Sequence, residues 1–337
     1  MRCFAHDRDS GISTLSEIAR VRGEIEANAF FGCYAYATQS GFRIFELTMG
    51  QEFWKNTDSR WLFGIDYGRS DPIALKKIAE QTNAEVRIFD GEYVVDSQGF
   101  VPRRDFHSKM AMLDNTSSNA TGLVVGSGNF SYNGLWRSVE AGAVLTATTS
   151  KEKEEQTAAV RGSFESLWEQ SVQLINIEKN YEERLSDLIS SKDDARSQDS
   201  SKAARGFWIE AGYVTKNRGD DKPGNQIWAP RGFRRFFGLE AAASESTLIG
   251  QITFETAVGA NVTKNYRGNP NAMEKLALPM PEDHGYGVYD GKVLLFEPTG
   301  NRFSLNVVEL DDFEMIYGHR LTNVERMNLG RRYGEFV

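Results

Sequence analysis

Apolar and polar residues are arranged in blocks along the first 150 residues, and the blocks alternate between strand-like and helix-like patterns. Apolar, aromatic-rich runs predict buried strands at 29–37, 61–68 and 84–91. Amphipathic repeats predict helices over GFRIFELTM (41–49) and 71–82, and Asp71 suits the N-cap of the second. Further strands are predicted at 106–114, 121–129 and 138–146. This rhythm indicates an α/β sandwich, with a mixed sheet flanked by helices.

The pattern changes after residue 150. Residues 151–190 are helical in pattern, whereas 190–206 are polar, Ser-rich and nearly free of apolar side chains, as in linkers. Beyond them, short strand candidates separated by Gly, Pro, Asn and Asp turns predict a mainly-β domain of the barrel or sandwich kind. The candidates are FWIEAGYVT, QITFETAV, GKVLLFEP and RFSLNVVEL. We therefore expect an N-terminal domain at 1–189, a linker at 190–205 and a C-terminal domain at 206–337.

Composition narrows the class of protein. The chain of 337 residues is 40% hydrophobic, which is enough for two cores, and it contains no run of about 18 apolar residues that would predict a membrane span. The first residues are polar and charged, unlike a signal peptide. Cys3 and Cys33 are the only cysteines, too few for a disulfide framework or a zinc site. We expect a cytoplasmic protein of bacterial or archaeal type, with no membrane partner.

Charge is distributed unevenly. The net charge is −8, which argues against a protein that coats nucleic acid non-specifically. Residues 205–337 hold 16 Lys and Arg against 17 Asp and Glu, so nearly all of the negative charge belongs to residues 1–204. Within residues 216–235, six basic side chains face only two acidic ones, Asp220 and Asp221. Because local fields decide polyanion binding, this segment is a candidate DNA contact.

The segment FHSKMAMLD (106–114) carries the candidate chemistry. On a strand alternate side chains share a face, so His107 and Lys109 are expected to point together. In GSGNF (126–130), Ser127 and Asn129 are also two residues apart, between glycines that remove bulk. Lysine supplies charge, Ser and Asn supply hydrogen bonds, and histidine can attack phosphorus or transfer protons. This set of side chains suits a phosphate, although either segment alone is commonplace in a strand or turn.

The combined pattern resembles the phospholipase D superfamily. His107, Lys109 and Asp114 form H-x-K-x4-D, and Ser127, Asn129 and Glu140 match the rest of that family's motif. The resemblance implies catalysis without metal or other cofactor: one histidine forms a phosphohistidine and a second protonates the leaving oxygen. It also implies that Lys109, Ser127 and Asn129 hold phosphate oxygens and that Glu140 orients the imidazole. Asp114 is expected to be a structural hydrogen-bonding partner.

The motif occurs once, yet the family's chemistry needs two histidines. A two-fold homodimer with one composite active site is the simplest solution. The remaining histidines, His6, His284 and His319, are expected to be surface or capping residues.

A single motif followed by a β domain resembles metal-independent restriction endonucleases of phospholipase D type, which carry a C-terminal B3-like pseudobarrel that reads DNA. The resemblance implies an endodeoxyribonuclease with two DNA-contacting arms in the C-terminal domain. Some such nucleases depend on a separate ATP-hydrolysing translocase, which this chain would need as a partner because it lacks a phosphate-binding P-loop motif. The candidate double-stranded DNA contacts are Lys216, Arg218, Gln226, Trp228, Arg231, Arg234, Lys264, Asn265, Arg267 and Asn269.

Two other functions remain open from the sequence. One is a phospholipase D-type phosphodiesterase that acts on lipid or another non-DNA substrate. The other is a DNA-binding protein with an inactive nuclease fold, which the intact motif argues against. Lipid turnover without DNA cleavage would favour the first alternative. A strict magnesium requirement would count against the phosphohistidine route.

Overall fold

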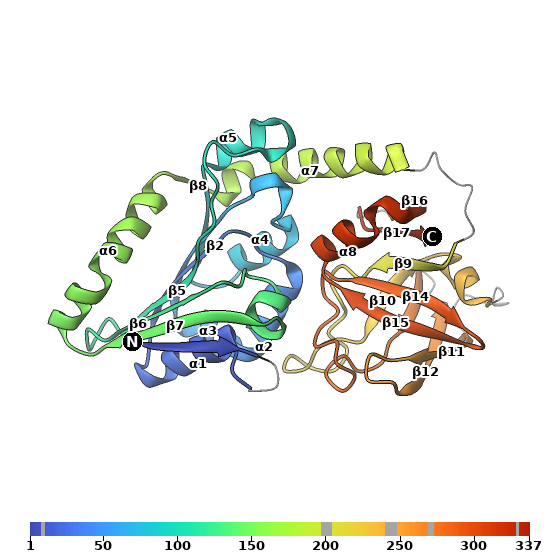
Figure 1. Ribbon diagram of the computed structural model, residues 1–337, viewed down its shortest axis with the longest axis horizontal. Coiled ribbons are helices and arrows are strands. Elements are labelled where there is room, and N and C mark those ends of the chain that lie inside the picture. The colour runs from blue at the N-terminus through green and yellow to red at the C-terminus, as the bar shows by residue number, and fades with distance from the viewer. Residues whose placement is uncertain (8–10, 197–203, 240–247, 269–272, 328–329) are drawn as a thin grey trace. The chain divides into compact units, whose positions relative to one another are not determined.

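A computed structural model of the chain describes residues 1–7, 11–196, 204–239, 248–268, 273–327 and 330–337 (Figure 1). Two compact units are present, Met1–Leu188 and Ile189–Val337, and each is built on its own sheet.

The sheet of the first unit has the strand order β1-β7-β6-β5-β2-β3-β4-β8. Strands β2, β3 and β4 are parallel to one another, and every other neighbouring pair is antiparallel. The sheet is therefore mixed, as predicted. The strand bounds are β1 Arg2–His6, β2 Ala29–Tyr34, β3 Asp58–Phe63, β4 Ala84–Phe89, β5 Lys109–Asp114, β6 Thr121–Gly126, β7 Glu140–Ala147 and β8 Ser171–Gln173.

Helices pack on both faces of this sheet, and two adjacent phenylalanines of β2 show it. Phe30 contacts Phe45 and Phe53 of helices α2 and α3, whereas Phe31 contacts Phe164 of helix α6. Since successive side chains of a strand point to opposite faces, these helices lie on opposite sides of the sheet. The α-helices are α1 Thr14–Glu24, α2 Gln39–Met49, α3 Gln51–Asn56, α4 Pro72–Ala79, α5 Gly91–Asp96, α6 Ser150–Glu169 and α7 Leu174–Arg196. Short 3-10 turns are η2 Asp66–Gly68 and η3 Gln98–Phe100, and η4 Asn133–Arg137 is a π-helix.

The predicted strands and helices of this unit are present, but several strands end earlier or start later than their apolar patterns suggest. The strand predicted at 106–114 begins only at Lys109, so His107 lies in the irregular segment before it. A side chain takes the place of a neighbouring strand there: Asp66 Oδ2 accepts the backbone N–H of Phe106 at 2.8 Å. Likewise β6 ends at Gly126, before Ser127 and Asn129. Asp71 caps α4, as predicted, by accepting the N–H groups of Ile73 and Ala74.

Two features of residues 150–206 were not predicted. A short strand, β8, separates the two long helices, pairs with β4 and is the last strand of the sheet on that side. Helix α7 also continues to Arg196, so the first residues of the segment predicted as a linker are helical. The centre of that segment, residues 197–203, lies outside the described residues.

The second unit is mainly β, as predicted. Its sheet has the order β10-β13-β12-β11-β15-β14-β9-β17-β16, and the two end strands are not paired with each other, so no closed barrel forms within the described ranges. The B3-like pseudobarrel remains an expectation. The bounds are β9 Gly206–Glu210, β10 Gln226–Pro230, β11 Leu248–Glu255, β12 Asn261–Gly268, β13 Met273–Ala277, β14 Val293–Thr299, β15 Arg302–Val308, β16 Leu321–Arg326 and β17 Arg332–Phe336, with η5 Phe233–Phe237, α8 Leu310–Tyr317 and η6 Gly318–Arg320.

Candidate active site

All motif residues except Asp114 lie at one edge of the first sheet, where strands β2 and β6 end and strands β5 and β7 begin. Strand β2 ends there at Tyr34, opposite Lys109 at the start of the antiparallel strand β5. Strand β6 ends at Gly126, which pairs with Gly142 near the start of β7, where Glu140 lies. Because strand ends and strand starts alternate along this edge, segments far apart in sequence bring their polar side chains to one place.

His107 and Lys109 are in direct contact. Lys109 Nζ lies 2.8 Å from His107 Nδ1 and donates to the backbone oxygen of His107 at 3.1 Å. His107 is exposed and Lys109 is half-buried. With a protonated lysine, the imidazole accepts at Nδ1 and carries its own proton at Nε2. The pair thus presents an ammonium group and a ring N–H to the same region, although His107 is not on the strand.

The GSGNF segment forms a tight turn after β6. A side chain at Gly128 would meet the carbonyl oxygen of Gly134 at 2.1 Å, so only glycine allows the two backbones to approach. Phe130 is fully buried in the aromatic core and anchors the turn. Asn129 Oδ1 is buried and has no hydrogen-bond partner among the described residues. The turn therefore holds Asn129 rigidly beside the strand end, with an amide oxygen that is not satisfied.

Glu140 contacts Ser127 rather than His107. Ser127 Oγ donates to Glu140 Oε2, and the N–H of Ala141 donates to Ser127 Oγ at 3.1 Å. These bonds join the turn after β6 to the start of β7. Within one chain Glu140 makes no hydrogen bond to His107, so the orienting role expected for this carboxylate is not fulfilled by its own histidine.

The electrostatics of Lys109 identify a residue that the sequence did not suggest. Burial lowers the pKa of Lys109 from its ordinary value; Glu140 acts to raise this pKa, and Arg69 acts to lower it further. Arg69 is exposed and follows η2, the turn after β3. Nothing in the local sequence links it to a motif forty residues away, because only the fold brings this turn near the site.

The turn that carries Arg69 is fastened to the segment that carries His107. Asp66 accepts the Phe106 N–H, and Tyr67 Oη donates to Asp105 Oδ1 at 2.9 Å. Burial raises the pKa of Asp66, although the N–H of Phe106 works in the opposite direction. Tyr67 has a φ of 59°, in the left-handed region that residues other than glycine seldom occupy. The turn therefore has a fixed, unusual conformation.

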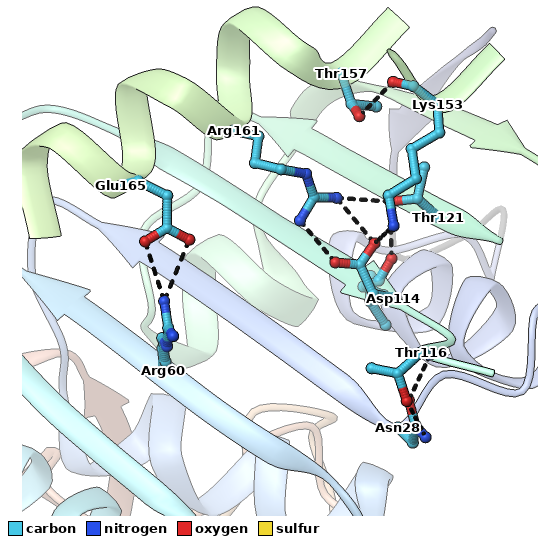
Figure 2. A network of polar contacts seen from close by, with 10 residues as sticks. Asn28, Arg60, Asp114, Thr116, Thr121, Lys153, Thr157, Arg161 and Glu165 are labelled. Atoms are coloured by element: carbon cyan, nitrogen blue, oxygen red, sulfur yellow. Dashed lines mark hydrogen bonds and ion pairs between the residues drawn. The ribbon is translucent and has the colours of Figure 1, made fainter. Parts of the chain in front are cut away.

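Asp114 lies at the other end of β5 and on the opposite face. It lies five positions after Lys109, an odd offset, which places it about 17 Å along the strand and turned toward α6. Figure 2 shows Arg161 of α6 binding both carboxylate oxygens, at 2.7 and 2.9 Å, with Lys153 Nζ at 3.4 Å. Burial alone would raise the pKa of Asp114, but Arg161, Thr121 and Lys153 outweigh it and the pKa is lowered. Asp114 therefore fastens helix α6 to the sheet.

The other histidines lie elsewhere. His6 is fully buried, not at the surface, and its Nδ1 lies 3.4 Å from the backbone N of Thr14, at the start of α1. His6 Nε2 has no partner among the described residues. His319 is exposed and His284 is half-buried, both in the second unit. His6, the only other histidine of the first unit, is thus shielded from solvent.

A polar groove lies on the second sheet, where strands β10, β13, β12 and β11 are neighbours. Its volume is about 550 Å³, and none of its lining residues is acidic. Lys275 pairs with Trp228 on one side and Arg267 on the other, and its ammonium lies 5.0 Å from the centre of the Trp228 ring. The lining residues are Asn225, Gln226, Gln251, Thr263, Lys264, Asn265, Arg267, Lys275 and Ala277.

The predicted DNA contacts divide into two groups. Gln226, Lys264, Asn265 and Arg267 line the groove, and Trp228 borders it through Lys275. Four further polar residues that line the groove were not predicted from the sequence, because only the pairing of the four strands brings them to one face: Asn225, Gln251, Thr263 and Lys275.

The remaining predicted contacts lie outside the groove. Arg218 pairs with Glu282 at 2.6 Å, and Lys216 lies 3.8 Å from Asp220. Arg234 pairs with the buried Glu274, which also accepts the hydroxyl of Tyr266. These three cations, which were expected to contact DNA, thus form ion pairs with acidic residues of the same chain. Arg231 is exposed, and Asn269 lies outside the described residues.

The described residues contain neither a cluster suited to a metal ion nor a helix suited to a membrane. No three His, Cys, Asp or Glu side chains in these ranges are grouped so that they could hold a metal ion, and we name no metal ligands. None of the helices in the described part of the chain combines the length and apolar character needed to cross a bilayer.

Comparison with known proteins gives partial structural matches. No protein-family model and no curated protein sequence matches the chain. NucT from Helicobacter pylori is similar over 51% of this chain and 98% of its own, with 12% identity and a TM-score of 0.36. Nuc from Salmonella typhimurium, a phospholipase D family member, is similar over 51% and 97%, with 14% identity and a TM-score of 0.35. Yeast tyrosyl-DNA phosphodiesterase is similar over 42% and 32%, with 10% identity and a TM-score of 0.26. Similarities of this size do not decide activity, which must be argued from the side chains.

Proposed function

We propose that this chain is a phosphodiesterase of phospholipase D type that cleaves double-stranded DNA as a homodimer. The observation that carries the proposal is the contact between His107 and Lys109 at the sheet edge where the Ser127–Asn129 turn and Glu140 also lie. A lysine, an amide and a histidine at one place can bind a phosphate and transfer its ester.

The proposed reaction has two steps. His107 Nε2 forms a bond to phosphorus while the ester oxygen leaves and takes a proton from a second imidazole. Water then breaks the N–P bond, and the second imidazole takes a proton from that water. For attack, Nε2 must be unprotonated, so the ring proton has to sit on Nδ1 and needs an acceptor such as a carboxylate. Contact with the Lys109 ammonium instead places the single ring proton on Nε2, so Lys109 must release Nδ1 before His107 can act as the nucleophile or, protonated at both nitrogens, as the proton donor.

The second imidazole is proposed to be the partner subunit's His107. His6 is the only other histidine of the first unit and is 0% exposed, so it cannot reach a bound phosphate. Two-fold symmetry would supply the missing histidine in an equivalent environment, and the bound substrate would make one ring the nucleophile and the other the proton donor. The same arrangement would leave Glu140 available to the other subunit's ring, consistent with its lack of a bond to His107 in one chain.

DNA is the proposed substrate because the second unit offers a groove with cations, amides and no acid. Lys and Arg bind phosphates, and Asn and Gln can pair with base edges. We propose that this groove reads DNA sequence, as in restriction endonucleases with a B3-like domain, and that any ATP requirement comes from a separate translocase. No observation in the described residues favours a lipid headgroup.

Plasmid cleavage in excess EDTA tests the proposal. The wild-type chain should cut DNA without added metal, and His107→Ala should bind DNA but not cut it. Full cleavage by that variant, or a strict magnesium requirement, contradicts the chemistry. Mixing equal amounts of wild-type and His107→Ala chains, with time for exchange, tests the shared site. About a quarter of the dimers would then be active, whereas independent sites would leave about half of the chains active.

A further inference from the structure

Arg69 is an exposed cation beside the proposed phosphate site, and the motif does not include it. Its guanidinium lies 5.8 Å from the centre of the Tyr67 ring. It forms no ion pair or side-chain hydrogen bond with any residue in the described ranges. The nearby carboxylates do not bind Arg69: Asp66 Oδ2 accepts from the Phe106 N–H, and Asp105 Oδ1 accepts from the Tyr67 hydroxyl. Arg69 therefore has hydrogen-bond donors available for a ligand.

The backbone that carries Arg69 is rigid. The adjacent Ser70 is fully buried, and its Oγ donates to the carbonyl of Gly64 at 2.5 Å and accepts from the N–H of Ala37 at 3.1 Å. Tyr181 of α7 donates to the carbonyl of Ser70 at 2.6 Å. Arg69 thus projects from a fixed point, and a ligand would not have to order the backbone to reach it.

The position of Arg69 differs from that of Lys109 in the plane of the sheet. The two residues follow β3 and begin β5, and β2 lies between these strands. Neighbouring strands are about 4.8 Å apart, so the two strand ends are separated by about 9.6 Å. Charges on one DNA strand recur about every 3.4 Å along the helix axis, so strand ends this far apart span more than one phosphate. Arg69, which stacks on Tyr67, and Lys109, which contacts His107, can therefore bind different phosphates.

We propose that Arg69 binds a phosphate that flanks the scissile one and so positions a polynucleotide across the site. This inference rests on the proposed function and names the substrate feature that it would require: at least two consecutive phosphodiesters. Guanidinium suits this task because it donates two parallel hydrogen bonds to phosphate oxygens. The Tyr67 ring beneath it limits the directions that the side chain can take.

The test compares two substrates. Bis(4-nitrophenyl) phosphate has one phosphodiester, whereas plasmid DNA has flanking phosphates. At a neutral pH, below the alkaline limb set by Lys109, Arg69→Gln should lower kcat/KM for plasmid about tenfold and leave kcat/KM for the small diester unchanged. The slope of log kcat/KM for plasmid against log salt should become shallower by about 0.9, as expected for one lost phosphate contact. Arg69→Lys should restore most of the slope.

Lys55→Gln is the matched control. Lys55 is an exposed cation at the end of α3, and α3 leads into the start of β3 rather than its end. The Lys55→Gln variant removes one positive charge, as Arg69→Gln does, and should change the kinetics of neither substrate. Unchanged plasmid kinetics in Arg69→Gln would overturn the inference alone, as would an equal loss on both substrates. A wild-type chain that hydrolyses the small diester but no DNA would overturn the proposed function as well.

Discussion

Replacing Asp114 with asparagine should destabilise the first unit and leave the chemistry nearly intact. The carboxylate is 5% exposed and holds Arg161 through two hydrogen bonds, with Lys153 as a further cation. Asparagine keeps the size and some hydrogen bonds, but it removes the negative charge between two positive ones. The variant leaves two cations facing each other at the junction between α6 and the end of β5 (Figure 2).

The size of the destabilisation by Asp114→Asn follows from the burial of the ion pair. Removing one partner of a buried ion pair costs about 3–5 kcal/mol. The side chains of Arg161 and Lys153 are 26% and 27% exposed, so both can turn partly toward water, and the low end, about 3 kcal/mol, applies. For a unit of this size, such a loss lowers Tm by about 6–12 °C.

The pH dependence has a definite sign. The pKa of Asp114 is lowered in the folded chain, so its contribution to stability is present above the unfolded pKa of about 3.9 and is lost as pH falls through the folded value. The Tm difference between wild type and Asp114→Asn should therefore be constant above about pH 5 and shrink below about pH 4.

Calorimetry of the full chain measures the first unit's transition. Glu165→Gln is the matched control, because Glu165 also joins α6 to the sheet, through Arg60 at 3.1 Å, but both side chains are 43% exposed. That pair is worth no more than about 1 kcal/mol. Well below Tm, both variants should cleave DNA at wild-type rates. The reasoning fails if Asp114→Asn loses cleavage while its Tm stays within about 2 °C of wild type.

Three further predictions concern the candidate sites. Burial and Arg69 lower the pKa of Lys109, so the alkaline limb of the pH–kcat/KM profile should lie below the ordinary lysine value of about 10.4. Arg69→Gln should move this limb upward, and a limb that does not move would contradict the electrostatic effect of Arg69 on Lys109. Arg267→Ala should weaken DNA binding and reduce its salt slope by about 0.9, with unchanged Tm, as expected for an exposed groove cation. Arg234→Ala should instead lower stability by about 3 kcal/mol, since it leaves the buried Glu274 without its cation; weaker binding with full stability would mean that Arg234 contacts DNA.

Continuous apolar runs predicted most strands of the first unit, because both faces of that sheet are covered. Phe30 and Phe31 bury into opposite layers, so the run around them is apolar throughout. The pattern could not predict where strands end. The end depends on which polar group takes each backbone N–H, and Asp66, forty residues away, takes that of Phe106. His107 was therefore assigned to a strand that begins two residues later.

Tertiary partners also explain which of the candidate residues line the groove. Lys264, Asn265 and Arg267 lie on one strand, so a local cluster of polar residues indicated them correctly as neighbours. Arg234 and Arg218 lie in a segment that is also rich in basic residues, yet they form ion pairs with Glu274 and Glu282. A basic segment shows where cations are abundant; only the fold shows which cations keep a free side for a ligand.

The spacing of the motif explains why the two ends of strand β5 have different roles. His107 precedes β5 by two positions and meets Lys109 directly, with their ring and ammonium 2.8 Å apart. Asp114 lies five positions after Lys109 on the strand, an odd offset that turns the carboxylate to the other face and the far end of β5, where it meets Arg161. The same strand thus offers chemistry at its start and an anchor for α6 at its end. An aspartate moved one position along would face the layer of α1 and α2, away from Arg161, and could not serve as that anchor.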